Sequence, residues 1–374
     1  MRSHLANPDI TDSELQSKTI DFLRFPLIVG VVLIHSQLSG TSIQGQQMMA
    51  DGDFPLYSEV SYLCSNIIAR IAVPLFFFFS GFLFFYRTNG FTKRIYGQKL
   101  KKRTRTLLVP YLFWNMLVAL LLLLGQTFMP GLGSGANKAL ADFAPAEWLR
   151  IFWNVREAGG EYYPINYPFW FIRDLMVVML FSPLVYVVVR RFGYYAVALL
   201  GVLWWFGWWV PVTGFSAAAC FFFTAGAFFS ICDLNFVRTM RPLLPVVAVL
   251  YPAMAVGELC LRECAGRITD VLHNANIMVG VILLISLSAR LLEQKKGHTV
   301  PFLSASSFFI FAYHAIPLGL AIKCMMLWLH PQSDILLLGL YFFCPAVVIA
   351  LGLTLYCLLQ KYLPKFTAVI TGGR

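Results

Sequence analysis

The chain has 374 residues, of which 59% are hydrophobic and only 13% charged, and its formal net charge is +11. Soluble globular domains carry about 25% charged residues, so this composition excludes an ordinary soluble protein and favours one solvated mainly by lipid. Apolar stretches recur along the whole length, and each can cross a bilayer core of about 30 Å. We therefore expect an all-α, polytopic integral membrane bundle that forms one domain over residues 1–374.

Ten apolar segments predict about ten transmembrane helices. They follow a short polar segment, residues 1–17, which does not resemble a signal peptide. The predicted spans lie roughly at residues 19–38, 60–86, 107–128, 168–189, 194–211, 215–231, 243–261, 271–290, 302–328 and 334–359. No hydrophilic stretch between them is long enough to bury a core of its own, so no additional soluble domain is expected.

The Lys and Arg residues divide unevenly between the two sides of this arrangement. With a cytoplasmic N-terminus, most of the 29 fall in inner segments, above all in residues 87–106, and five fall in outer loops. The positive-inside rule requires this distribution, so we expect both termini in the cytoplasm and the chain in the plasma (inner) membrane. Topology and contact with membrane lipid explain the basicity, and no nucleic-acid partner is expected.

The first span, "DFLRFPLIVGVVLIHSQL" (residues 21–38), contains an arginine and a histidine in an otherwise apolar segment. Arg24 and His35 are eleven positions apart, which on a helix is about 1100°, close to three full turns, with a rise of about 16.5 Å. Both side chains therefore share one face, and Asp21 can pair with Arg24. The alternative is that Arg24 reaches the inner headgroups and His35 lies at the outer interface.

Three further candidate site residues, Arg70, His314 and Arg173, lie inside predicted spans. Arg70 lies about ten residues into the second span, too deep to reach the headgroups, so we expect a cavity or an anionic partner. His314 is similarly central, although a histidine bonded to a neighbouring carbonyl would explain it equally well. Arg173 adjoins Asp174 near the outer end of the fourth span, where an internal ion pair or an interfacial anchor is the alternative to a substrate site.

The most basic segment is "KRIYGQKLKKRTRT" (residues 93–106). One interpretation is a topology signal that contacts anionic lipid; the other is a docking site for a phosphorylated cytoplasmic ligand, because arginine matches phosphate geometry. Lys102 and Arg105 would be neighbours on a helix. The two interpretations are compatible. The eight cysteines show neither a CxxC pair nor metal-ligand spacing, so neither a metal nor a disulfide framework is expected.

Five pieces of the sequence, in order, resemble the membrane acyltransferase-3 family, which moves acyl groups, usually acetyl from acetyl-CoA, onto carbohydrates or other envelope acceptors. They are Arg24-x10-His35, "VPLFFFFSGFLF" (73–84), "KLKKRTRTLLVPYLFWN" (99–115), "PFWFIRDL" (168–175) and "SSFFIFAYHAIPL" (306–318). The resemblance covers nearly the whole chain. It implies an acetyl-CoA-dependent O-acetyltransferase, an acyltransferase transferring groups other than aminoacyl groups, with a carbohydrate or glycolipid acceptor.

The resemblance also implies that Arg24 and His35 belong to the active site. Basic residues of the 99–105 segment, namely Lys102, Arg103 and Arg105, would help to hold CoA. In this hypothesis His35 is the general base on an acceptor hydroxyl, a role that suits a group with a reference pKa of about 6.5. Arg70 would stabilise the oxyanion. Arg173 and His314 are further candidates for binding the substrate or the oxyanion.

Two other functions fit a stripe of buried charges. The main alternative is a polytopic transporter or exporter of a small polar or anionic substrate. Transporters often have paired, interrupted helices in two related halves, and the sequence shows no such pairing. A sensor or scaffold is the third possibility, and it predicts that the charged stripe tolerates substitution.

Overall fold

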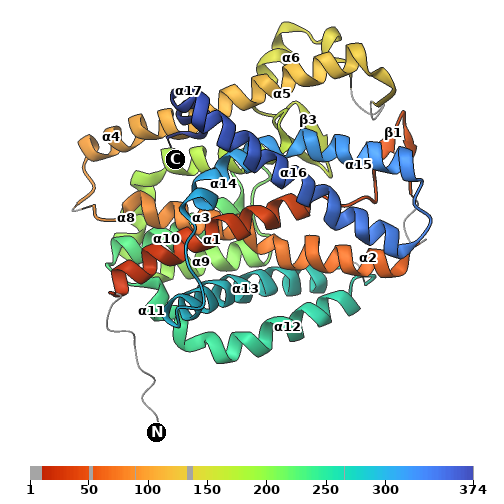
Figure 1. Ribbon diagram of the computed structural model, residues 1–374. Helices are drawn as coiled ribbons and strands as arrows, with labels where there is room; N and C mark the ends of the chain where they lie inside the picture. Colours follow the sequence, from red (N-terminus) through yellow and green to blue (C-terminus); the bar gives the residue numbers. More distant parts are fainter. Residues whose placement is uncertain (1–10, 50–53, 89, 133–137, 265, 374) are drawn as a thin grey trace.

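The computed structural model describes residues 11–49, 54–88, 90–132, 138–264 and 266–373. These residues form a helical bundle with two small antiparallel hairpins, as Figure 1 shows, so the expected all-α class is confirmed. In the first half of the chain the elements, with short 3-10 and π segments labelled η, are α1 (Asp12–Ile34), β1 (Ser42–Ile43), β2 (Gln46–Gln47), α2 (Pro55–Tyr62), η1 (Leu63–Ile68), η2 (Ala69–Ile71), α3 (Ala72–Phe85), α4 (Lys93–Arg103), η3 (Thr104–Leu108), α5 (Val109–Phe128), η4 (Pro130–Leu132), η5 (Leu140–Asp142), α6 (Pro145–Arg150), β3 (Arg156–Ala158), β4 (Glu161–Tyr163) and η6 (Tyr167–Phe169). The second half contains α7 (Trp170–Leu180), α8 (Ser182–Phe192), α9 (Tyr194–Trp205), α10 (Ala217–Ile231), α11 (Phe236–Met240), η7 (Arg241–Leu243), α12 (Leu244–Cys260), α13 (Arg267–Glu293), α14 (Pro301–Tyr313), α15 (Ala315–Leu329), α16 (Asp334–Tyr362) and α17 (Pro364–Thr371).

The number of helices that can cross a membrane is smaller than the ten predicted. Five described helices are long and apolar enough, and two bent helix pairs raise the number to seven. The five are Pro55–Phe85, Lys93–Phe128, Phe236–Cys260, Arg267–Glu293 and Asp334–Tyr362. The other three predicted spans coincide with α1, which has charged residues throughout its first half, and with α9 and α10, which have only 12 and 15 residues. The chain is therefore a multi-pass membrane protein with five to seven candidate spans.

Two predicted spans are broken in the middle. The pairs α7–α8 and α14–α15 bend by 64° and 66°, at Phe181 and His314. Pro183 and Pro317 follow the breaks and lack the N–H that would bond the carbonyl four residues earlier, which favours a kink there. Each segment was predicted as one continuous span, and neither interruption was predicted from the sequence.

Helices α3 and α10 cross closely at two glycines. A Cβ atom on Gly81 would lie 1.9 Å from the carbonyl oxygen of Phe223, and one on Gly226 would lie 1.9 Å from that of Phe78. Small residues at such crossings let two backbones approach inside a membrane, where packing and not water drives association. Phenylalanines of both helices then fill the surrounding core.

Replacing Gly226 with alanine is expected to destabilise the bundle. The atom that the new methyl group would strike is backbone, so the two helices must separate, and overpacking of this kind costs about 1–3 kcal/mol. The measurement is the thermal unfolding midpoint of the purified protein in detergent. The matched control is Gly339→Ala in α16, where a Cβ meets nothing within 4 Å. Equal unfolding midpoints for the two variants would contradict this account of the crossing.

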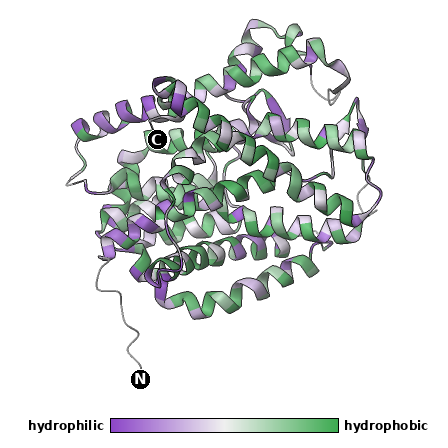
Figure 2. Cartoon of the chain, in the orientation of Figure 1, coloured by the Kyte–Doolittle hydropathy of each residue, from purple (hydrophilic) through white to green (hydrophobic). Residues whose placement is uncertain are grey.

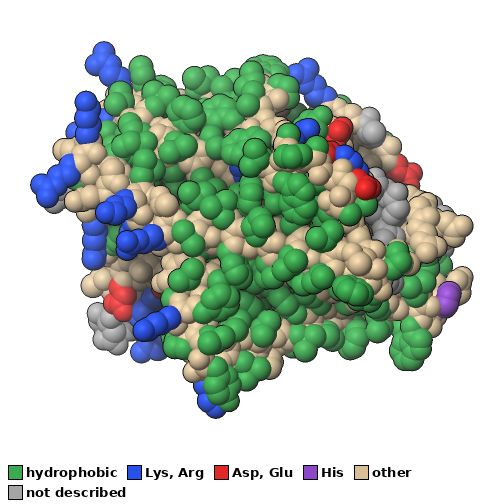
Figure 3. Space-filling view, turned by 90° about the horizontal axis from the view of Figure 1, so that it is seen from above, with side chains coloured by type: hydrophobic (Ala, Val, Ile, Leu, Met, Phe, Trp, Pro, Cys, Tyr) green, Lys and Arg blue, Asp and Glu red, His purple; other side chains and the backbone are tan. Residues whose placement is uncertain are grey.

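Charge separates the two ends of the bundle. Figure 2 shows that α4 is strongly hydrophilic, and Figure 3 shows Lys and Arg side chains gathered at the end of the molecule where α4 lies. We call this end, which contains Lys93, Arg94, Lys101, Lys102 and Arg103, the basic end. Helix α1 begins there, and the hairpin β1–β2 lies at the opposite end (Figure 1). The chain thus runs from the basic end towards the opposite end along α1.

Candidate active site

His35 lies where α1 ends, and its ring meets aromatic rings from two distant parts of the chain. The backbone N–H of His35 bonds the carbonyl of Val32, 3.1 Å away, as part of the helix cap. The ring of Tyr167, in η6, stands edge-on with its centroid 4.8 Å away. The ring of His314, at the break between α14 and α15, is stacked at 5.5 Å and 19°. Two of the predicted site residues, His35 and His314, are therefore in contact.

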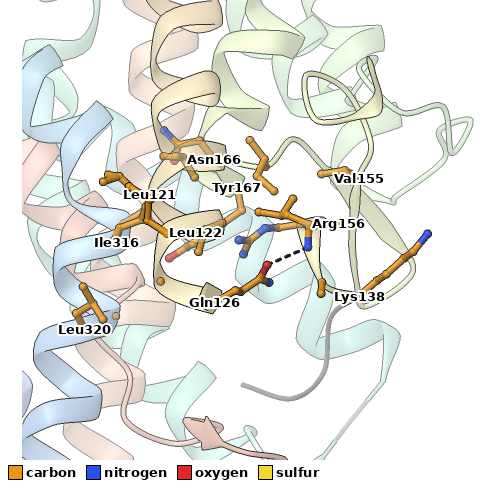
Figure 4. Close-up of a pocket in the computed structure, with 18 of the residues that line it drawn as sticks. Leu121, Leu122, Gln126, Lys138, Val155, Arg156, Asn166, Tyr167, Ile316 and Leu320 are labelled. Atoms are coloured by element: carbon orange, nitrogen blue, oxygen red, sulfur yellow. Dashed lines mark hydrogen bonds between the residues drawn. The ribbon is translucent and has the colours of Figure 1, made fainter. Parts of the chain in front are cut away.

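The three rings meet beside a cavity of about 950 Å³, shown in Figure 4. We call it the large cavity. Its walls come from α5, α15, the segment between residues 138 and 156, and η6, and both His35 and Tyr167 line it. A volume of this size is at the upper end of small-molecule sites and exceeds what an acyl group alone would fill. The cavity can therefore hold a larger substrate next to the imidazole of His35.

The hydrogen bonds of His314 define which protons it carries. Its side chain is fully buried, and Nδ1 lies 2.8 Å from the carbonyl oxygen of Phe311. A carbonyl only accepts, so Nδ1 carries the proton, and Nε2 of the neutral ring has a free lone pair. Nε2 is buried and has no partner among the described residues. In this state His314 can accept a hydrogen bond from a hydroxyl, but its Nε2 cannot donate one to an oxyanion.

Asn166, which precedes Tyr167 and lines the large cavity, offers a second acceptor. Its Nδ2 donates to the carbonyl of Ala312, 3.3 Å away, and its backbone N–H donates to Oδ1 of Asn115 at 3.1 Å. Its own Oδ1 is buried and has no partner in the described part of the chain. Buried acceptors without partners are costly, so Oδ1 of Asn166 suits a ligand that carries a hydroxyl.

Arg70 lies on the second span in a distorted stretch of helix. The π segment η1 and the 3-10 turn η2 replace regular α-helix here, and such interruptions often occur at functional sites. One guanidinium nitrogen donates to Oδ1 of Asn66 at 3.2 Å. The charge of Arg70 interacts with His35 and with Glu161 of β4, although Arg70 does not line the large cavity. Arg70 therefore acts on His35 through its charge, and its role at the oxyanion stays a prediction.

Arg24 lines a second, smaller cavity of about 170 Å³ near the basic end. Arg103 of α4 lines the same cavity, together with Ser80 and Ser304, and Arg24 also pairs with Asp21 at 3.1 Å. The structure therefore joins Arg24 to one of the three basic residues predicted to hold CoA. The other two, Lys102 and Arg105, are exposed and do not line this cavity.

Aromatic residues separate the two cavities. Phe311 lines the smaller cavity and stacks on Phe169, with ring centroids 5.4 Å apart and planes within 4°. The centroid of the Phe311 ring also lies 6.2 Å from that of the His314 ring. A molecule that extended from Arg24 to His35 would have to displace Phe311.

Arg173 lines neither cavity. Its side chain is only 4% exposed and donates to Asp174 at 2.9 Å and to the carbonyls of Trp153 and Tyr162 at 2.7 and 2.9 Å. The internal ion pair, which was the alternative to a substrate site, is therefore present, and the two bonds to carbonyls tie the segment that precedes η6 to the start of α7. We assign Arg173 a positioning role for this segment.

The sequence did not predict that residues 138–156 form part of the site. Arg156 of β3 lies over the ring of Tyr167, 6.0 Å from its centroid, and its side chain is drawn in Figure 4 between Tyr167 and Gln126. Lys138 donates to Glu147 at 2.7 Å, and this bond holds the pKa of Glu147 below its usual value. The only available signal was the length of the loop, residues 129–167, because its contacts with His35 are made by tertiary folding.

Comparisons with known proteins identify the family of this chain. A family model described as an acyltransferase domain matches residues 17–359. The succinoglycan biosynthesis protein ExoH of Rhizobium meliloti (strain 1021) is 28% identical over 362 residues, which cover 96% of this chain and 92% of that protein. No solved structure matches the chain significantly. Because the family model spans most of the chain and includes every residue of the site, the protein belongs to the acyltransferase-3 family of membrane proteins.

Proposed function

We propose that the protein is an integral-membrane O-acyltransferase that moves an acyl group, expected to be acetyl, from acyl-CoA to a hydroxyl of an envelope carbohydrate or glycolipid. The observation that carries the proposal is the position of His35, which lines the large cavity at the end of the same helix whose Arg24 lines the smaller one. The name of the relative, a succinoglycan biosynthesis protein, supports a carbohydrate acceptor.

The donor would bind from the basic end, which we take as the cytoplasmic side because CoA is cytoplasmic. The phosphates of CoA suit the guanidinium groups of Arg24 and Arg103. Lys102 and Arg105, on the adjoining surface, would attract the polyanionic end of the donor. The smaller cavity, about 170 Å³, has room only for the thin arm of the donor, which would displace Phe311 on its way to His35.

In the transfer step, His35 takes the proton of the acceptor hydroxyl while the oxygen attacks the thioester carbonyl. The carbonyl oxygen becomes an oxyanion, which the nearby positive charge of Arg70 stabilises. The carbon–sulfur bond then breaks, and the thiolate of CoA takes the proton from the imidazolium of His35, so ester and CoA thiol are the products. Oδ1 of Asn166, which lines the large cavity, accepts a hydrogen bond from a neighbouring hydroxyl of the acceptor and helps to orient it.

Arg103→Gln is expected to raise KM for acetyl-CoA about tenfold or more, with little change in the KM of the acceptor, since a charge-assisted bond contributes about 1.5–3 kcal/mol. Lys102→Gln is the matched comparison, one residue away but exposed, and we expect a smaller increase. Steady-state kinetics of CoA thiol release by the purified protein measure both. Equal effects on donor and acceptor would exclude Arg103 from the CoA site.

One observation favours the transporter alternative: the bent pairs α7–α8 and α14–α15 resemble the interrupted helices of transporters. Proteoliposomes that contain the protein, acetyl-CoA and envelope glycolipid extract distinguish the two functions. An acyltransferase releases one CoA thiol for each ester found by mass spectrometry. Movement of a substrate across the bilayer without CoA release would overturn our proposal.

A further inference from the structure

We infer that the acceptor is an amphiphile, a saccharide joined through a phosphate to a long apolar chain, and that it enters the large cavity sideways from the membrane between α5 and α15. The inference rests on the proposed function and adds the chemical class of the acceptor. Three features of the described residues carry it: an apolar wall open to lipid, a cation without an anionic partner, and the path that joins both to His35.

The wall formed by α5 and α15 faces both the cavity and the lipid. Leu121 and Leu124 of α5 and Leu320 of α15 line the cavity and are nevertheless 44%, 43% and 40% exposed. Both helices belong to candidate spans, so this exposed surface meets lipid tails. A side chain that belongs at once to a cavity and to a lipid-facing surface marks an opening between them. A chain of hydrocarbon can occupy such an opening at little cost, whereas a bare saccharide would lose its hydration there.

Two glycines keep this opening wide. Gly125 of α5 and Gly319 of α15 line the cavity, and a Cβ on either would meet nothing within 4 Å. The space beside them is therefore open and not filled by neighbouring side chains.

Arg156 supplies the charge that an anionic ligand requires. Its half-buried side chain forms neither an ion pair nor a hydrogen bond within the described ranges, and its one charged or aromatic contact is the ring of Tyr167. By contrast, Lys138 is paired with Glu147, and Arg150 donates to Asn154. A partly buried guanidinium without a carboxylate is costly until an anion binds, and its planar fork matches a phosphate.

Tyr167 connects this charge to the reaction. The guanidinium of Arg156 lies 6.0 Å from the centroid of the Tyr167 ring. The ring of His35 lies 4.8 Å from the same centroid. A phosphate at Arg156 therefore positions the sugar next to it at His35, and the apolar chain leaves past Leu320. The hydroxyl that receives the acyl group thus belongs to a sugar close to the phosphate.

Binding, and not activity, tests the inference. The full-length protein in phosphatidylcholine nanodiscs is incubated with a radiolabelled polyprenyl phosphate, the corresponding polyprenol, or glucose 1-phosphate. We expect the polyprenyl phosphate to bind at least tenfold more tightly than the polyprenol and glucose 1-phosphate to show no measurable binding. Arg156→Gln should weaken binding about tenfold, and Gly319→Leu should block it by filling the opening. The matched controls are Arg267→Gln, an exposed arginine outside the cavity, and Gly339→Leu, in α16 with open space at its Cβ.

Each outcome supports or overturns the inference. Equal binding of polyprenol overturns the phosphate site, equal binding of glucose 1-phosphate overturns the lateral path, and equal effects of the variants and their controls overturn both. The proposed function fails separately. If polyprenyl phosphate binds as expected while the wild-type protein never releases CoA from acetyl-CoA, the acyltransferase proposal is wrong and the ligand class stands. If His35-dependent acyl transfer occurs but no variant affects lipid binding, the acyltransferase proposal stands and the inferred ligand class is wrong.

Discussion

Changing His35 to alanine is expected to lower the rate of acyl transfer by about 10²–10⁴-fold, because a positioned general base contributes that much to such reactions. Among the described residues no other imidazole lines the large cavity, and Nε2 of His314 is buried. The measurement is CoA thiol release together with the ester mass of the acceptor, at matched amounts of folded protein.

The matched control for this variant is His298→Ala, an exposed histidine between α13 and α14 that lines neither cavity. It should keep full activity. The variant at His35 should also still bind acetyl-CoA, because Arg24, which we assign to the donor, is eleven residues away along α1, a rise of about 16.5 Å. A loss of activity of less than about tenfold would remove His35 from the role of base.

Arg173→Met is expected to destabilise the fold by about 3–5 kcal/mol, the usual cost of leaving one partner of a buried ion pair uncompensated. Asp174 would remain as a charge that is 2% exposed, and the carbonyls of Trp153 and Tyr162 would lose their donor. The thermal unfolding midpoint in detergent measures the effect. Arg238→Met is the matched control, because its ion pair with Asp12 is 81% and 67% exposed on the two side chains and contributes little.

The double variant Arg173→Met with Asp174→Leu separates charge from packing. Removing both charges should restore part of the lost stability, since an apolar pair of similar volume often replaces a buried ion pair without loss. If the single and double variants unfold at the same temperature, the uncompensated carboxylate is not the cause. Because Arg173 ties the segment that precedes η6 to α7, we also expect the KM of the acceptor to rise in folded Arg173→Lys protein.

The sequence predicted a helix over most of α1 because a helix is a local and periodic structure. Eleven positions between Arg24 and His35 bring both side chains to one side of any straight helix, whatever surrounds it. The basic segment before α5 was recognised for the same reason, from the spacing of neighbouring charges. Which of its residues lines a cavity was not predictable, and the structure selects Arg103 where the sequence treated Lys102, Arg103 and Arg105 alike.

The sequence by itself determined the class of protein: a helical, lipid-solvated chain of the acyltransferase-3 family, with an arginine and a histidine on one helix face. Only the tertiary structure decided that His314 and Tyr167 surround His35, that α14 and α15 part at His314, and that Arg173 supports a loop and lines neither cavity. The reason is physical. Hydrophobicity and helical period act over a few turns of one segment. The large cavity instead forms where segments separated by more than a hundred residues, such as α5 and α15, meet.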